Sequence, residues 1–538
     1  MFDSFGPRVF ALPPGADFPA ALVDGLQARM ADEPPEAMAQ VTLFLNTTRM
    51  RRAVREVLAA RGAAFLPNLR LVTDPGTGPL GGLFPAMTPL RRRLELSQLI
   101  SRLLDAQPDL APRAALFDLS DSLATLMDEL QDEGVSPEAL AALDVSDHSA
   151  HWKRTQDFLA ILAPFFAPSD MVDPAARHRR AVLDLVAAWQ DTPSPHPVIV
   201  AGSTGSRGTT ALLMQAVARL PQGALVLPGF DFDMPGHVWS GMADALTAED
   251  HPQFRYRRLL EGLDLAPSAV QTWSATTPPQ ALNRLISLSL RPAPVTDQWL
   301  TEGQDLPDLC EATGHVTLIE APGPRAEASA IALILRQAAE QGRSAALITP
   351  DRMLTRQVTA TLDRWGIVPD DSAGKPLALS APGRLLRHVA ALFGRALTPE
   401  ALLTLLKHPL TATGADRGNH LRLTRDLELR LRRSGPAFPD GAALRDWAGQ
   451  QRDAAASGWA DWIATAIDGA RHVGTRSLQD HVAHHLGLTE ALAQGAGGTG
   501  TGELWLREAG QAARAATDSL SREAAHGGLL SPADYADL

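Results

Sequence analysis

The chain has 538 residues, of which 45% are hydrophobic and 20% are charged. That length predicts about three or four domains or lobes, and the composition excludes wholesale disorder. Lys and Arg together number 49 and Asp and Glu number 61, which gives a formal net charge of −12. This balance excludes a protein coated in positive charge, as histone-like and ribosomal proteins are, but it allows a local basic groove that binds nucleic acid.

The cysteine content and the terminal sequence indicate a compartment. The single cysteine, Cys310, excludes a disulfide framework, a Cys-only zinc site and a self-contained iron–sulfur cluster. A reducing, cytoplasmic location is therefore expected. The N-terminus lacks a basic segment followed by an apolar one, and no run of about 18 apolar residues occurs, so we expect neither a signal peptide nor a membrane span.

The first 230 residues alternate between strand-like and helix-like segments. Strands are predicted at 9–12, 41–45, 69–73, 198–201 and 224–227, with helices at 19–30, 49–61 and 209–220. This alternation is typical of βαβ units and a parallel sheet. Residues 91–189 instead show helical spacing, so we expect a first α/β lobe over 1–90 and 190–273 that is interrupted by a helical insertion.

The second half begins with a polar stretch containing several prolines, residues 274–314, which predicts a linker. A second α/β lobe is expected over 315–395, with strands at 316–320 and 345–349. Residues 396–538 read as helices, and their glycine-rich run at 495–502 predicts a flexible break. A helix start at 531–534 lies only a few residues before Leu538, and this predicts a truncated chain.

Two loops occupy positions where an α/β protein binds phosphate. The first, residues 12–18 (LPPGADF), has one glycine, two prolines without N–H groups, an Asp and no Lys, which favours a plain turn over a nucleotide loop.

The second loop, residues 202–210 (GSTGSRGTT), offers amides, hydroxyls and an arginine to an anion, but it lacks the Walker A spacing and its lysine. The alternative is a glycine-rich turn whose last hydroxyls cap the next helix. The candidate phosphate-binding residues are Gly202, Ser203, Gly205, Arg207 and Thr209.

Two further segments suit a nucleic-acid backbone. Each places hydroxyls and arginines at the start of a helix that follows a predicted strand, where helix N-termini and guanidinium groups contact phosphate. The alternative for both is a solvated helix face. The candidate DNA-binding residues are Thr47, Thr48, Arg49, Arg51 and Arg52 in the first segment, and Thr349 and Arg352 in the second.

Metal and catalytic signatures are weak. His481 and His485 are four residues apart on a predicted helix, as in zinc peptidases, but Val482 and His484 occupy the positions where the general-base Glu belongs. We predict no metal site and no catalytic residue.

The layout resembles that of superfamily 1 helicases: an α/β fold with two superfamily-1-helicase-like parallel-sheet lobes and large all-helical insertions. Ordered motifs along nearly the whole chain are similar to the AddB family, subunits of AddAB-type double-strand-break repair helicase–nucleases, in the form found in alphaproteobacteria. The motifs are 9–15 (VFALPPG), 200–206 (VAGSTGS), 227–231 (LPGFD) with Trp239, 251–253 (HPQ), 319–325 (IEAPGPR), 348–352 (ITPDR), 364–367 (RWGI), 371–374 (DSAG) and 406–409 (LKHP).

The resemblance implies DNA double-strand-break repair by homologous recombination. The chain would be the helicase-like, DNA-binding, non-motor subunit of an ATP-dependent helicase–exonuclease, with the AddA motor–nuclease subunit, DNA ends and single-stranded DNA as partners and no membrane.

ATP and Mg²⁺ would act at the AddA partner. Family members continue into a C-terminal nuclease domain held by an iron–sulfur cluster, and because this chain shows no nuclease residues, no cofactor is expected in it. Two alternatives stay open: a nucleotide-binding enzyme using loop 202–210, and an interaction scaffold without DNA contact.

Overall fold

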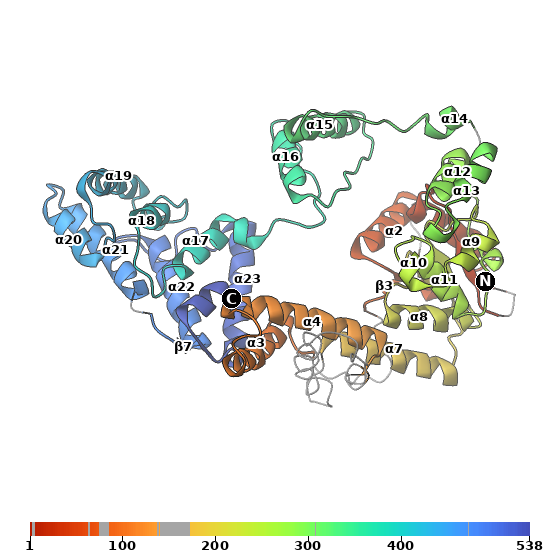
Figure 1. Ribbon diagram of the computed structural model, residues 1–538, viewed down its shortest axis with the longest axis horizontal. Helices are drawn as coiled ribbons and strands as arrows, with labels where there is room; N and C mark the ends of the chain where they lie inside the picture. The colour runs from red at the N-terminus through yellow and green to blue at the C-terminus, as the bar shows by residue number, and fades with distance from the viewer. Residues whose placement is uncertain are drawn as a thin grey trace. The chain divides into compact units, whose positions relative to one another are not determined.

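The protein is described here from a computed structural model, which divides into two compact units (Figure 1). Unit 1 comprises Met1–Pro89 and Ser122–Thr317, and unit 2 comprises Leu90–Asp121 and Leu318–Leu538. The division falls within helix α4 (Leu116–Glu133). Part of the predicted helical insertion and of the turn after residue 74 lies outside the described residues, which are 1–2, 6–62, 65–74, 86–136, 139, 173–306, 308–471 and 473–538.

Unit 1 is built on a six-stranded, fully parallel sheet, which confirms the α/β prediction for the first lobe. The five predicted strands all form, each within about two residues of its expected bounds. The sixth is two polar residues long and gives no recognisable pattern. In spatial order the strands are β3 (Asn68–Leu71), β2 (Thr42–Leu45), β4 (Val198–Ala201), β5 (Gly223–Leu227), β1 (Val9–Ala11) and β6 (Gln271–Thr272).

Helices cover both faces of this sheet. Leu22 of α1 and Val54 of α2 pack with Ile199 against one face, and Leu213 of α8 packs with Val200 against the other. The strands are therefore buried on both sides, as their nearly continuous apolar sequences indicate. The helices following the strands are α1 (Phe18–Arg29), α2 (Thr48–Ala60), α7 (Pro174–Asp191), α8 (Gly208–Arg219), α9 (Gly236–Gly241), α10 (Ala245–Ala248) and α11 (Phe254–Glu261), with 3-10 turns η1 (Pro35–Gln40) and η4 (Pro267–Ala269).

The segment predicted as a linker, 274–314, is largely helical. Its described residues form a folded helical segment in which Arg291 is buried. The Arg291 guanidinium donates to Gln298 Oε1 at 2.9 Å and to Glu302 Oε2 at 2.9 Å, so its charge is compensated inside the segment. The elements are α12 (Gln280–Ser289), η5 (Ala293–Val295), α13 (Gln298–Thr301), η6 (Glu302–Asp305) and α14 (Leu309–Thr313).

The second parallel sheet does not form in the described residues. Helices α15 (Pro324–Glu340) and α16 (Arg352–Asp363) are present and pack side by side (Figure 1). The segments 316–320 and 345–349 pair with no strand, and the side chains of Leu318 and Ile348 are 84% and 95% exposed. An apolar strand sequence needs neighbouring strands to satisfy its backbone, and these two segments have none here.

The rest of unit 2 is helical, as predicted for 396–538. Two two-residue strands, β7 (Arg476–Ser477) and β8 (Leu529–Leu530), pair antiparallel. The helices and 3-10 turns are α3 (Pro89–Ala106), η2 (Arg113–Ala115), η7 (Leu377–Leu379), α17 (Ala381–Ala390), α18 (Pro399–Leu406), α19 (Arg417–Ser434), α20 (Gly441–Gly449), α21 (Ala455–Arg471), α22 (Leu478–Gln494), α23 (Arg507–Glu523), η8 (Ala524–His526) and α24 (Pro532–Asp537).

Two local predictions in this region have different outcomes. The helix start at 531–534 is confirmed, because Ser531 and Asp534 form a capping box on α24. The flexible break at 495–502 is wrong. A Cβ atom on Gly498 would overlap the Gln494 carbonyl oxygen, and one on Gly502 would overlap Thr413 Oγ1, so this run is a tightly packed turn.

Among the described residues, no helix combines the length and hydropathy needed to cross a bilayer.

Candidate nucleic-acid interface

The loops after β1, β2 and β4 leave the sheet at one edge. In parallel sheets, ligands bind outside the carboxyl ends of the strands, so this edge is the first place to examine. Strands β2 and β4 are neighbours, with Leu45 opposite Ala201. Gly202 has a φ of +79°, and a Cβ atom there would lie 3.4 Å from Asn46 Oδ1. The structure therefore brings the predicted DNA-binding loop of β2 next to the start of the predicted phosphate loop of β4.

Helix α2 begins with an uncharged cap. Thr47 has an extended backbone, and its Oγ1 accepts a hydrogen bond from the Met50 amide at 3.1 Å. Thr47, Thr48 and Arg49 are exposed. The hydroxyl cap satisfies one amide but carries no negative charge. It therefore does not neutralise the partial positive charge of the helix N-terminus.

The arginines of α2 differ in their surroundings. Arg51 is half-buried, whereas the side chain of Arg52 is 79% exposed and pairs with Glu56 at 2.7 Å. An exposed i,i+4 pair of this kind contributes roughly 0.3–0.5 kcal/mol. A phosphate can therefore compete with Glu56 for Arg52 at little cost.

The loop after β1 is closed by the chain itself. Asp17 Oδ1 caps α1 by accepting from the Ala20 amide at 3.2 Å, so a carboxylate occupies the place where a bound phosphate would lie. Asn283 Nδ2 donates to the Pro14 carbonyl at 2.9 Å. A Cβ atom on Gly15 would approach Pro279 Cδ to 2.9 Å. The start of α12 thus covers the position of a Walker A loop.

A pocket of about 470 Å³ lies beside that loop and is lined by Pro13, Phe232, Asp233 and Arg284, among others. Burial raises the pKa of Asp233, the neighbouring Asp231 raises it further, and Arg284 lowers it. The pocket therefore presents one carboxylate beside one guanidinium, which does not suit a polyphosphate.

The loop after β4 is occupied by the end of α4. Glu133 Oε1 accepts from the Gly208 amide at 2.8 Å, and Asp132 Oδ2 pairs with Arg207 at 3.2 Å. Thr209 Oγ1 donates to the Asp132 carbonyl at 3.0 Å. Burial raises the pKa of Asp132, and Arg207 opposes that shift. The groups that sequence reasoning assigned to an external phosphate therefore have internal partners.

Within that loop, Ser203 is buried and its Oγ accepts from the Gly205 amide at 3.3 Å. Gly202, Ser203 and Gly205 thus form the turn, and Arg207 and Thr209 attach it to α4. Sequence reasoning missed Asp132 and Glu133 because they lie about 75 residues before the loop, and no local pattern connects them to it.

The second predicted DNA segment lies in unit 2. Asp351 caps α16 by accepting from the Met353 amide at 2.7 Å, and Thr349 Oγ1 accepts from the Asp351 amide at 3.0 Å. Arg352 pairs with Asp371 at 3.2 Å and donates to the Gly374 carbonyl at 3.2 Å. This helix start therefore carries a carboxylate cap, whereas the cap of α2 is neutral.

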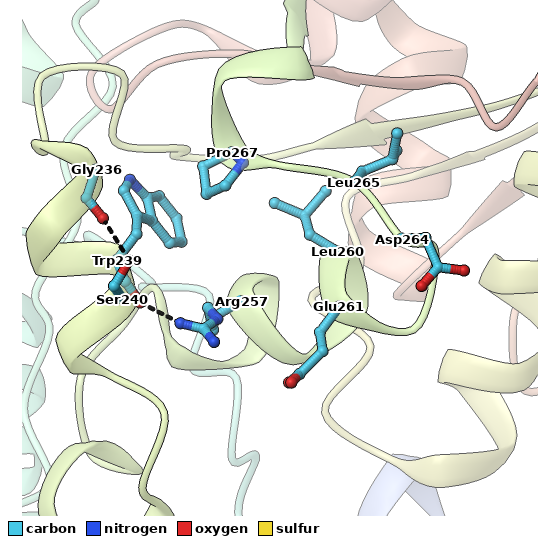
Figure 2. A pocket seen from close by; sticks show the side chains of 9 residues that line it. All are labelled: Gly236, Trp239, Ser240, Arg257, Leu260, Glu261, Asp264, Leu265 and Pro267. Carbon is cyan, nitrogen blue, oxygen red and sulfur yellow. Dashed lines mark hydrogen bonds between the residues drawn. The ribbon is translucent and has the colours of Figure 1, made fainter.

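Figure 2 shows a second pocket, of about 330 Å³, among the helices that follow β5. Trp239, Leu260 and Pro267 form its apolar side. The Arg257 guanidinium donates to the Trp239 carbonyl oxygen, while the carboxylates of Glu261 and Asp264 point away from the apolar side of the pocket (Figure 2). With its guanidinium engaged and two carboxylates at the rim, this pocket does not favour a phosphate.

The histidines of α22 belong to the helical core. His481 Nε2 is 2.9 Å from the Leu530 carbonyl oxygen, and His485 is hydrogen-bonded to Tyr535 Oη and to the Leu386 carbonyl, each at 2.8 Å. Within the described part of the chain, no group of three or more His, Cys, Asp and Glu side chains is arranged to hold a metal ion.

No protein-family model and no curated protein matches this chain. The chemistry is therefore argued from the geometry. Of the helix starts that follow β1, β2 and β4, those of α1 and α8 are filled by the carboxylates of Asp17 and Glu133, and that of α2 is capped by a neutral hydroxyl. Among these three starts, an external anion has the best opportunity at α2.

Proposed function

We propose that this chain is a helicase-like, DNA-binding, non-motor subunit of an ATP-dependent helicase–exonuclease that repairs double-strand breaks by homologous recombination. One observation carries the proposal: the N-terminus of α2 combines a neutral cap with Arg49, Arg51 and Arg52 at the carboxyl edge of the sheet. Helix N-termini and guanidinium groups are the usual contacts of a phosphate backbone.

The non-motor part of the proposal rests on the other two loops. A motor subunit must hold a nucleotide triphosphate, and that requires free amides and a lysine at the loop after β1. Here Asp17 caps that helix and Pro279 covers the loop, while Glu133 caps the helix after β4. These contacts disfavour the nucleotide-binding alternative at residues 202–210.

The similarity to the AddB family supplies the rest of the proposal. We infer that the partner is the AddA motor–nuclease subunit, which would use ATP and Mg²⁺, and that the shared substrates are DNA ends and single-stranded DNA. The iron–sulfur cluster of the family belongs to its C-terminal nuclease domain. A cytoplasmic location is part of this proposal, since a single cysteine suits a reducing compartment.

A second candidate function, a docking scaffold without DNA contact, is favoured by one observation. Leu318, Ile348 and Val368 are each more than 80% exposed beside α15 and α16. Apolar side chains that gather on a surface often mark contacts with another protein. This candidate and the first are separated by whether the purified chain binds DNA.

The test is fluorescence-anisotropy binding of the full chain to a forked DNA end, with and without ATP, at 50 and 200 mM salt. The proposal expects binding that ATP does not change and that falls by tenfold or more between the two salt concentrations, as backbone contacts do. Binding that requires ATP would support the nucleotide enzyme instead. No binding at 50 mM salt by a folded protein would support the scaffold.

A further inference from the structure

The positive charge of the chain is concentrated in one part of unit 2. Residues 381–434 contain ten Lys and Arg against four Asp and Glu, a local net charge of +6 in a chain whose net charge is −12. These residues form α17, α18 and α19, which follow one another directly. Such an asymmetry is the electrostatic footprint of an anionic partner.

Three basic side chains share one face of α17. Arg384, Arg387 and His388 are spaced by three and four residues, which places them together on a helix. Arg384 and Arg387 are exposed. Among the residues that the structure describes, no carboxylate lies within 4.0 Å of either guanidinium, whereas Arg352, Arg422, Arg432 and Arg445 of the same unit each have such a partner.

Two further basic groups join this face from the following helices. His408, just after α18, has its ring 6.1 Å from that of His388. Arg417, the first residue of α19, donates to the carbonyl oxygens of His408 and Thr411. The five groups therefore come from α17, from the turn after α18 and from the start of α19.

His408 contains an unsatisfied donor. Its side chain is buried, with 6% of the residue exposed. Nδ1 accepts from the Leu410 amide at 3.2 Å, so in the neutral ring Nε2 carries the hydrogen, and Nε2 has no hydrogen-bond partner among the described residues. A buried N–H group without an acceptor is costly, and because Nε2 is shielded from solvent, His408 lies beneath the surface that the arginines form.

The electrostatic surroundings of the two histidines are entirely positive. Burial is the main cause that lowers the pKa of His408 to about 4; His388, Arg384 and Arg417 contribute to this shift and the Ala381 carbonyl opposes it. The pKa of His388 is lowered by burial and then by Arg387 and Arg384. No carboxylate contributes to either shift, so the positive charge of this cluster is not balanced from within.

We propose that Arg384 and Arg387, in the cluster that they form with His388, His408 and Arg417 (called here the α17 basic cluster), bind backbone phosphates of a nucleic-acid strand. This rests on the proposed function and deepens it, because it adds a contact in unit 2 to the one at α2. Guanidinium groups suit phosphate because they donate two parallel hydrogen bonds to it.

Positive charge also extends along α19, where the arginines are spread around the helix. Helix α19 continues from Arg417 with three more exposed arginines, Arg425, Arg430 and Arg433, for which the described residues supply no carboxylate within 4.0 Å. An 18-residue helix extends for roughly 27 Å, a length that spans several nucleotides. The positive charge therefore runs well beyond the reach of one phosphate group.

The test compares two double variants of the full chain for binding to a 20-nucleotide single-stranded oligonucleotide. R384E/R387E replaces two positive charges of the cluster by negative charges. R343E/R364E makes the same charge change at two exposed arginines next to α15 and α16. The proposal expects R384E/R387E to weaken binding at least tenfold and to reduce the salt slope by about 1.4, whereas R343E/R364E stays within about threefold of the natural chain.

Thermal melting of both variants is the control that tests whether they are folded. Equal losses in the two variants, or no loss in R384E/R387E, would overturn the proposal while leaving the proposed function intact. Competition by polyglutamate as effective as that by the oligonucleotide would overturn it in favour of an acidic protein partner. Failure of the natural chain to bind the oligonucleotide would contradict the proposed function itself.

Discussion

Single capping residues determine which helix starts of this protein can receive an anion. Asp17, Glu133 and Asp351 each place a carboxylate on the amides that begin α1, α8 and α16, whereas Thr47 places a hydroxyl on α2. A carboxylate satisfies the amides and also opposes the helix dipole, so it excludes a second anion. The difference between Thr and Asp at one position thus separates a closed helix start from an open one.

The role of Glu133 can be measured directly. We expect E133A to lower the free energy of unfolding by about 1 kcal/mol, because the Gly208 amide loses its acceptor. The exposed helix start should then bind sulfate weakly, so sulfate should raise the melting temperature of E133A more than that of the natural chain. The control is E129A on the same helix, where the side chain is exposed. Equal stability of E133A and E129A would contradict the capping role.

A helix glycine of unit 1 tests how tightly that unit is packed, and a helix glycine of unit 2 serves as its control. A Cβ atom on Gly25 of α1 would overlap Trp273 Nε1, which donates to the Leu22 carbonyl at 3.0 Å, whereas one on Gly458 of α21 meets nothing within 4 Å. We expect G25A to destabilise the protein by about 1–3 kcal/mol and G458A to be neutral or stabilising by up to about 1 kcal/mol. Chemical denaturation of both variants measures this, and a stabilising G25A would show that Trp273 does not pack as described.

At the scale of helices, unit 2 is joined by buried neutral histidines. His485 connects α22 to Tyr535 of α24 and to the Leu386 carbonyl of α17. Burial is the main cause that lowers the pKa of His485 to about 4, with smaller contributions from the neighbouring His484 and His481. These helices therefore depend on an unprotonated ring.

The pH dependence of stability follows from this shift. Because the pKa is lower in the folded protein than its ordinary value of 6.5, the unfolded chain binds the proton more tightly. The contribution of His485 is complete above about pH 6.5 and is lost as the pH falls toward 4, at most about 3 kcal/mol. We expect chemical denaturation at pH 7.5, 6 and 5 to show falling stability, with a smaller fall in H485Q. An identical fall in H485Q would assign the effect to other groups.

The sequence predicted individual elements of this protein better than their assembly. Strands 42–45 and 198–201 and the helices after them were predicted because their patterns are local and strongly apolar. The segment 274–314 was misread because Arg291 appears as a polar linker residue, although its charge is compensated by partners seven and eleven residues away. The second sheet was misread for the opposite reason, since 316–320 and 345–349 have strand sequences but no neighbouring strand.

The candidate interface was predicted in part. Parallel strands end at one edge, so the meeting of Asn46 with Gly202 follows from adjacent strands β2 and β4, although the sequence alone does not give that adjacency. The carboxylate of Glu133, which fills the start of α8, was not predictable from the sequence because it comes from a distant helix. The α17 basic cluster was overlooked because its members are spread over three helices and none belongs to a motif.

At the scale of the whole molecule, charge is distributed unevenly and in a way that suits a nucleic-acid partner. A net charge of −12 would repel DNA from most of the surface, while the start of α2 and residues 381–434 are locally positive. Binding through such limited surfaces should be steep in salt and confined to a few contacts. The account therefore expects binding to weaken when the charge at the start of α2 is reversed, and the α17 basic cluster to contribute separately.

The most direct measurement is the affinity of R49E/R51E for a forked DNA end, compared with the natural chain and with R258E. Arg258 lies exposed on α11, which covers the other face of the sheet, so R258E changes charge away from α2. The account predicts a loss of about tenfold and a shallower salt dependence for R49E/R51E, and a change of less than about twofold for R258E. Unchanged affinity of a folded R49E/R51E would contradict the claim that the start of α2 holds the DNA backbone.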